Sequence, residues 1–181
     1  MKITLYTLAT ASLMFACQPV LAEAMKPKPA GDAAPMMVMD RATFVRVVPS
    51  ANDFEIRSSE LALEKAEASD LKDAAKMIIA DHKKAGEKLQ AVLKGKGVDL
   101  AMPADLSPKH QKMLDQLQAA NGKDFDTLYL DMQAQAHMEA IGIFRTYAGS
   151  GDDQSVVGFA KETLPSLETH MAHVKMLISA R

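Results

Sequence analysis

Apolar residues recur along this chain at helical spacing, in runs separated by short breaks. In one run, Leu71, Ile78 and Leu89 belong to a series in which apolar side chains repeat every three or four residues. No stretch alternates apolar and polar residues as a half-buried strand does, and no Asn-Gly or Asp-Gly turn lies between β-branched runs. The pattern therefore predicts an all-α domain.

The breaks in the pattern define the expected helices. A short lead-in helix over 40–48 is expected to end at Pro49, and Ser50 to cap the first long helix. Ser69 is expected to cap the second long helix, and Ser107-Pro108 to begin a short extra helix. The four long helices are predicted at residues 51–68, 70–94, 123–148 and 153–179, with Pro165 inside the last.

Four amphipathic helices, each with one apolar stripe, can bury those stripes against one another. Tight turns join them in two antiparallel pairs, and the short extra helix lies in the crossing between the pairs. We therefore expect an up-down-up-down four-helix bundle with a short N-terminal lead-in helix, over residues 40–181.

The N-terminus has the pattern of an export signal. Residues 1–22 combine a basic start, an uncharged apolar stretch and small residues, as signal peptides do. Cleavage after Ala22 would release the protein, whereas a lipobox-like sequence ending at Cys17, the single cysteine, would give a lipid anchor. Residues 23–39, rich in Pro, Ala and Met, are predicted to be a disordered tether. We expect an exported protein, periplasmic or associated with the outer membrane.

Charge and composition exclude several functions. The 21 basic and 23 acidic residues are interspersed, for a net charge of -2, so nucleic acid is not an expected partner. No segment of the mature chain has the ~20 consecutive apolar residues that a membrane span needs. No serine lies in a Gly-x-Ser-x-Gly turn, so no catalytic nucleophile is predicted.

Three histidines fall inside the apolar stripes of different predicted helices. His82, His137 and His170 stand where the repeat otherwise places aliphatic residues, whereas His110 and His173 are expected to face solvent. A buried imidazole needs partners for its ring nitrogens, and three of them in one bundle interior suit a metal ion. Residue counts place His82 and His137 at one level, ~20 Å from the turns, but His170 about one turn deeper.

The first long helix offers a carboxylate at the same level, Glu55, as the only charge in a stripe of small residues. We predict that these side chains hold one divalent transition metal, with zinc, copper and iron as candidates. The alternative is that the histidines are structural and the glutamate is an acid favoured by the helix dipole. The cluster Met36-Met37-Val38-Met39 is a separate candidate for Cu(I). The predicted metal ligands are Glu55, His82, His137 and His170.

Some of these residues also carry a family resemblance. Asp81-His82, Phe125-Asp126 and Leu164-Pro165-Ser166-Leu167 with His170 follow in an order similar to that of the domain-of-unknown-function family 4142. These are exported bacterial proteins often labelled as outer membrane proteins. The resemblance covers roughly residues 41–177 and implies a ferritin-like four-helix fold, while it leaves the activity open.

Departures from related sites narrow the chemistry. The family tends to carry an acid directly before His137, where this chain has Ala136, so that support for the histidine is missing. Ferritin-like di-iron sites use Glu-x-x-His pairs, but Ile79 and Leu167 occupy the glutamate positions here. A mononuclear site, or none, is therefore expected.

Three functions remain open at this point. The first is binding of one metal ion in the core, for storage, buffering or stress protection. The second is a non-catalytic envelope protein with structural histidines, whose outer face binds a protein partner of unknown identity. The third is an enzyme with an open coordination position on the metal, although no acid–base pair is evident beside the histidines.

Overall fold

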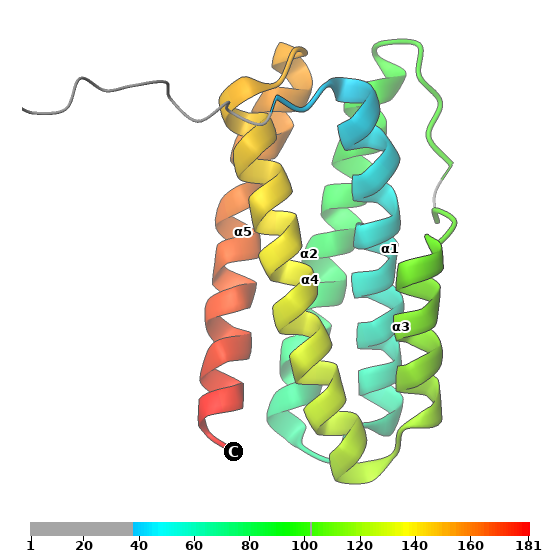
Figure 1. Cartoon of the computed structure of the whole chain (residues 1–181), viewed down its shortest axis with the longest axis vertical. Coiled ribbons are helices and arrows are strands. Elements are labelled where there is room, and N and C mark those ends of the chain that lie inside the picture. The colour runs from blue at the N-terminus through cyan, green and yellow to red at the C-terminus, as the bar shows by residue number, and fades with distance from the viewer. Residues whose placement is uncertain (1–37, 102) are drawn as a thin grey trace, which may run out of the picture. The chain divides into compact units, whose positions relative to one another are not determined.

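The computed structural model describes residues 38–101 and 103–181, and over these residues the predicted all-helical architecture is confirmed. The signal peptide expected over 1–22, with Cys17, and nearly all of the tether expected over 23–39 lie outside these ranges and stay predictions. Among the described helices, none has the length and apolar character to cross a membrane. The helices are α1 (Arg41–Lys65), α2 (Ser69–Lys94), α3 (Pro108–Ala119), α4 (Gly122–Ser150) and α5 (Gln154–Ser179) (Figure 1).

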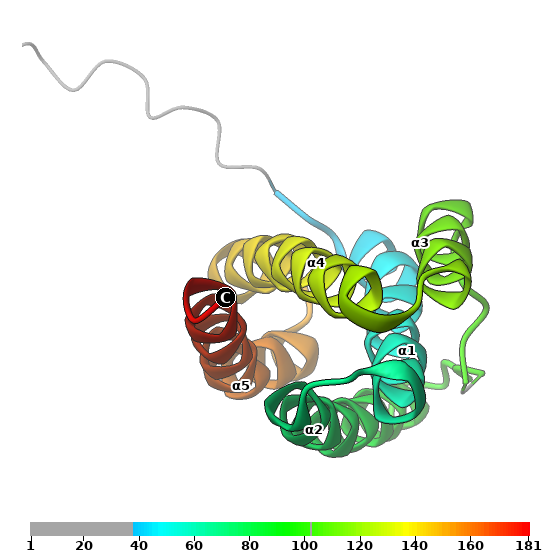
Figure 2. The same ribbon diagram turned by 90° about the horizontal axis from the view of Figure 1, so that it is seen from below.

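Four of these helices form a bundle, and the shorter α3 packs on its outside (Figure 2). Around the bundle, α1 contacts α2 and α4, and α5 contacts the same two helices. The short helix lies against α1 and α4. Each long helix therefore has two neighbours and one face turned toward a shared interior.

The directions of the helices differ from the predicted up-down-up-down order. The α1–α2 turn meets the start of α4, where the amides of Glu67 and Ala68 donate to the Asp126 carboxylate over 3.1 and 3.2 Å. At the opposite end, Arg41 at the start of α1 pairs with Asp153 beside the α4–α5 turn. Helices α2 and α4 therefore run in the same direction, because α3 carries the chain back along the bundle before α4 begins (Figure 1).

The lead-in helix and the first long helix are one continuous helix, which corrects the prediction that Pro49 separates them. The N-cap is Asp40, whose side chain accepts a 2.7 Å hydrogen bond from an amide of the first turn. Proline removes one backbone hydrogen bond, but buried residues on both sides, such as Phe44 and Phe54, hold the helix together across it. Ser50, expected as a cap, is a buried residue inside α1.

Other predicted helix starts have mixed outcomes. Ser107 caps α3 as expected, accepting a hydrogen bond from the amide of His110. Asp153 caps α5 and accepts from two amides of the first turn. Ser69 does not cap α2: it is the first helical residue, and Ala68 precedes it without a side-chain cap. A serine can cap only when its own backbone is extended, and here the extended residue is Ala68.

The buried face of α2 drifts away from a strict heptad. Continued in steps of three and four residues, the apolar repeat that contains Leu71, Ile78 and Leu89 predicts Ala85 and Val92 in the core. Both are half-buried, and Gly86 and Leu93 are buried instead. A straight helix rotates by about 20° per heptad relative to a 3.5-residue repeat. His82 faces the interior in either register, whereas Ala85 is left at the edge of the helix contact.

Two apolar clusters fill the bundle, one toward each end. Phe54, Leu71 and Phe125 belong to the cluster near the α1–α2 turn, and Phe44 and Phe144 to the one near the α4–α5 turn. The interior also contains buried polar side chains from all four long helices, which we call the polar layer. The polar layer consists of Asn52, Glu55, Ser58, His82, Gln133, His137 and His170.

Candidate metal centre

Three imidazoles meet inside the bundle, each from a different long helix: His82 from α2, His137 from α4 and His170 from α5. Their exposed fractions are 5%, 0% and 1%. The ring centroids lie 5.3, 5.5 and 5.6 Å apart, and one nitrogen of each ring lies within 4.8 Å of the other two. The residues that interrupt three separate apolar stripes thus form one cluster.

The depth mismatch expected for His170 does not keep it away from His137. Side chains on a helix lean toward its N-terminus. Because α4 and α5 are antiparallel neighbours, His137 leans away from their connecting turn and His170 leans back toward it. The two rings therefore converge, with His137 Nε2 3.2 Å from His170 Nδ1.

Each ring also has a hydrogen bond to an oxygen atom outside the cluster. These oxygens belong to an amide side chain, a backbone carbonyl and a carboxylate, and they accept hydrogen bonds, so the ring nitrogens facing them carry the proton. The distances are 3.1 Å from His82 Nδ1 to Asn52 Oδ1, 3.0 Å from His137 Nδ1 to the Gln133 carbonyl oxygen, and 2.9 Å from His170 Nε2 to Asp81 Oδ2.

These outer bonds leave an unprotonated nitrogen on the inner side of every ring. A neutral imidazole holds one proton, so His137 Nε2 and His170 Nδ1 face each other as two lone pairs across 3.2 Å. His82 Nε2 is buried without a hydrogen-bond partner. Around a tetrahedral metal with bonds of about 2.0–2.1 Å, two nitrogen ligands stand roughly 3.3 Å apart. The chemistry of the inner nitrogens, and the 3.2 Å spacing of the His137–His170 pair, thus fit a metal ion.

Burial keeps the histidines neutral. It lowers the pKa of His82 well below its usual value and lowers the pKa of His137 to about 4. Burial also lowers the pKa of His170, while its hydrogen bond to Asp81 acts in the opposite direction. Neutral imidazole is the form that binds metals, so the ligands are available at neutral pH without the loss of a proton.

Glu55 is buried beside the cluster, on the proton-bearing side of His137. Its Oε1 lies 3.4 Å from His137 Nδ1, and neither carboxylate oxygen has a hydrogen-bond partner. Burial raises the pKa of Glu55 to about 8. The atoms that converge within 4.8 Å, among the described residues, come from the three histidines. Glu55 thus stands next to this group as a buried acid.

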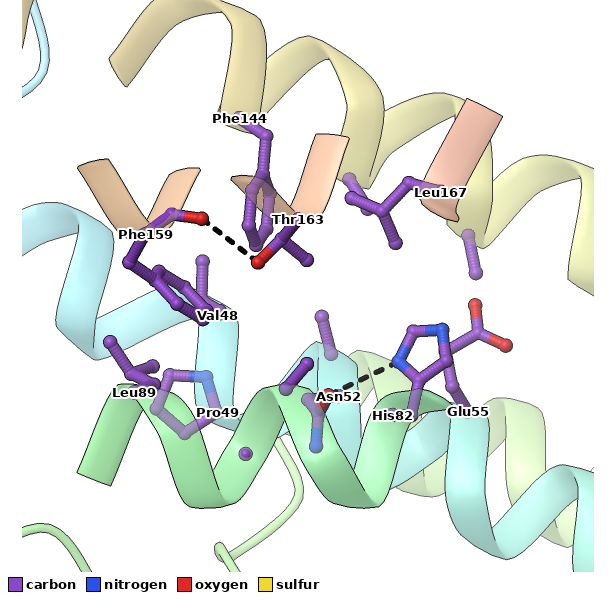
Figure 3. Close-up of a pocket in the computed structure, with 15 residues that line it drawn as sticks. Val48, Pro49, Asn52, Glu55, His82, Leu89, Phe144, Phe159, Thr163 and Leu167 are labelled. Carbon is purple, nitrogen blue, oxygen red and sulfur yellow. Dashed lines mark hydrogen bonds between the residues drawn. The ribbon is translucent and has the colours of Figure 1, made fainter. Parts of the chain in front are cut away.

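An internal cavity adjoins the cluster (Figure 3). Its volume is about 30 Å³, which is room for one or two water molecules. Glu55, His82 and Asn52 line one end, and the rest of the lining is apolar apart from Thr163. The cluster is therefore not sealed by packing on every side.

The sequence did not point to the partners of the histidine rings. Asn52 and Asp81 are ordinary polar residues of helices, although Asp81 adjoins His82 in the motif that carries the family resemblance. The bond to His137 uses a backbone carbonyl, for which side-chain identity gives no signal. Residue spacing within a helix could have indicated only that Gln133 lies one turn before His137.

Other candidate residues lie elsewhere. His110, expected to face solvent, is buried, because α3 packs its first turn onto α1 and His110 Nδ1 lies 2.7 Å from Ser50 Oγ. His173 is half-buried. Of the methionine cluster at 36–39, the first two residues lie outside the described residues, and Met39 packs on the apolar cluster near the α4–α5 turn.

Comparisons with known proteins support the fold and give the family. A solved structure described as "CopM in the Cu(II)-bound form" is similar, with 18% sequence identity and a TM-score of 0.67. The match covers 80% of this chain and 99% of that one. No curated protein matches this chain. The family model described as "Domain of unknown function (DUF4142)" matches residues 26–177, and the chain therefore belongs to the DUF4142 family.

Proposed function

We propose that this protein binds one copper ion through His82 Nε2, His137 Nε2 and His170 Nδ1. The observation that carries the proposal is the set of outer hydrogen bonds, which turns an unprotonated nitrogen of every ring toward the others. Structural histidines would be expected to satisfy one another, donor to acceptor. Here the inner contact pairs two acceptors, and the third inner nitrogen has no partner.

Glu55 supplies the negative charge in this proposal. A cation in the bundle interior is costly unless an opposite charge lies nearby, and Glu55 is a carboxylate of the polar layer that has no hydrogen-bond partner. Its poor accommodation in the metal-free protein is relieved when a cation is bound. The proposed ligands are thus three of the four residues expected from the sequence, and Glu55, expected as the fourth ligand, contributes charge from the outer side of His137.

Copper is the metal that we favour. Imidazole ligands suit zinc, copper and iron, and among divalent ions of the first row copper binds such ligands most tightly. The similar solved structure, CopM, is described in a Cu(II)-bound form. Among the described residues, no acid–base pair faces the inner nitrogens, since Glu55 contacts the outer side of His137, and this favours storage, buffering or protection over turnover. We also infer a ferritin-like bundle, and an exported protein that is released to the periplasm or anchored through Cys17.

Copper analysis of protein purified without a histidine tag tests this function. We expect about one copper per chain, retained through gel filtration, and loss of that copper in His82→Ala and His137→Ala. His173→Ala is the matched control, because it removes a histidine outside the cluster and should keep the copper. Substoichiometric copper in the unaltered protein, or full binding by His82→Ala, would overturn the proposal.

A further inference from the structure

We propose that the metal reaches the histidines from the surface between α2 and α5, past the side chains of Ala85 and Thr163. The inference rests on the proposed metal-binding function. It starts from a depression of about 140 Å³ on that surface, lined by residues of both helices, which we call the α2–α5 depression. Ala85 and Thr163 line this depression and also line the internal cavity beside His82 and Glu55.

The wall between solvent and the internal cavity is thin at this point. Ala85 and Thr163 are both half-buried, so each contributes to the outer surface and to the cavity. Ala85 presents only a methyl group, and the Thr163 hydroxyl is bonded to the Phe159 carbonyl oxygen over 2.9 Å (Figure 3). The Ala85 methyl group and the Thr163 side chain thus form the boundary that the depression and the cavity share.

The same surface contains the partly exposed carboxylate that is hydrogen-bonded to one of the three histidines. Asp81, whose side chain is 46% exposed, lines the α2–α5 depression and accepts the hydrogen bond from His170 Nε2. The corresponding partners of the other two rings, Asn52 and Gln133, are buried. A cation that arrives in the depression therefore meets a carboxylate already in contact with one of the three ligands.

Other surface hollows lack this connection. The hollow over α1 and α2, beside Arg57 and Lys83, shares no lining residue with the cavity. The hollow over α4 and α5, beside Met138 and Arg145, shares none either. On the side of α1 and α4, the short helix α3 packs against part of both helices.

Local features of the α2–α5 depression indicate that side-chain packing, and not charge, limits the entry of the metal ion. Its charged residues are two lysines and two acids, and Lys88 pairs with Glu162. Charge therefore gives little net attraction for a cation. Pro165 follows Thr163 by two residues and cannot donate a helical hydrogen bond, which leaves α5 less constrained at the proposed entrance.

Copper uptake by the metal-free protein, followed by stopped-flow absorbance, tests this route. Ala85→Leu should slow uptake at least tenfold without changing the final stoichiometry, because it thickens the wall and leaves the ligands intact. Thr163→Ala should speed uptake several-fold. Ala91→Leu, which adds the same volume at an exposed position of α2, should load at the rate of the unaltered protein.

The outcomes separate the route from the function. Ala85→Leu and Thr163→Ala proteins that bind one copper at the unaltered rate would overturn the route alone. If Ala85→Leu does not fold, an unchanged rate in Thr163→Ala still overturns it. Failure of the unaltered protein to bind copper would overturn the proposed function, and this inference with it.

Discussion

Unsatisfied buried polar atoms concentrate around the histidines. They include His82 Nε2, both oxygens of Glu55, Asn52 Nδ2 and Gln133 Oε1. Each buried polar atom without a partner costs about 1–3 kcal/mol, and apolar residues of similar size would often serve a bundle core better. The presence of these unpartnered atoms in one layer is best explained by a ligand that binds to them.

Glu55→Gln should stabilise the metal-free protein at neutral pH. The folded protein holds the Glu55 proton up to about pH 8, whereas the unfolded chain releases it near pH 4.5, so stability falls as the pH rises between these values. We expect a gain of about 1–3 kcal/mol at pH 7 and none at pH 4, measured by urea unfolding. Glu64→Gln, at an exposed position of the same helix, should give no gain; a destabilised Glu55→Gln protein would contradict this reading.

Asp81→Asn should weaken metal binding while the protein stays folded. The Asp81 carboxylate fixes the proton of His170 on Nε2 and leaves Nδ1 free, and an amide can instead donate to that nitrogen. Loss of such a supporting partner typically lowers affinity by about 10–100-fold. Competition titration with a copper chelator measures the change. Asp73→Asn, at an exposed position of α2, is the control. Equal copper affinities for the unaltered protein and both variants would refute the role of Asp81 in orienting His170.

The apolar periodicity could identify the candidate ligands, but not the hydrogen-bond partners that determine which ring nitrogen carries the proton. His82, His137 and His170 interrupt apolar repeats, and burial follows from that pattern alone. The protonation of the rings depends on Asn52 and on a backbone carbonyl, which come from tertiary packing. The conclusion that three lone pairs face inward therefore needed the structure.

At the scale of helices, α1 and α3 are joined by a buried polar contact. The Ser50 hydroxyl lies 2.7 Å from His110 Nδ1 and accepts a 2.8 Å hydrogen bond from the Ser107 amide. The ring of His110 stacks on Phe54 with centroids 5.4 Å apart. This contact joins the start of α3, from which the chain returns along the bundle, to the middle of α1.

Ser50→Ala should loosen α3 without affecting the histidine cluster. The substitution leaves the buried His110 Nδ1 and the half-buried Ser107 amide without this partner, at a cost of about 1–3 kcal/mol. Hydrogen exchange should become faster in the amides of α3, with little change near His137. Thr127→Ala, at an exposed position of α4, is the control. Unchanged exchange in α3 would show that the contact does not hold the helix.

Helix identity was predictable from the sequence, but helix direction was not. Local signals located the helices, including the Ser107 cap, because capping depends on neighbouring residues. Pro49 was a misleading signal, since tertiary burial on both sides of it outweighs one lost backbone bond. The parallel course of α2 and α4 follows from the packing of α3, which no local pattern encodes.

At the scale of the whole molecule, the stability of the metal-free protein should fall in acid, because the three buried histidines with lowered pKa values outweigh the opposite slope of Glu55. The unfolded chain binds protons at its histidines near pH 6.5, whereas His137 in the folded protein stays neutral to about pH 4. Between these values, each such histidine costs up to about 1.4 kcal/mol per pH unit. Urea unfolding at several pH values measures this slope, and His137→Leu should reduce it; an equal slope in the variant would contradict the linkage.

Copper should raise the stability of the folded protein, because the unfolded chain cannot assemble three ligands from separate helices. With free copper at about 100 times its Kd, the expected gain is roughly 2.7 kcal/mol. Thermal unfolding with and without copper measures it at pH 7. The gain should shrink toward pH 4, where protons compete for the imidazoles. An equal shift in His82→Ala would assign the effect to binding elsewhere.

Anomalous diffraction at the copper edge, from crystals of the copper-loaded protein, tests the central claim most directly. The account predicts one strong peak inside the bundle, about 2.0 Å from His82 Nε2, His137 Nε2 and His170 Nδ1. A copper peak bound by the other ring nitrogens, or copper only at surface methionines or histidines, would contradict it.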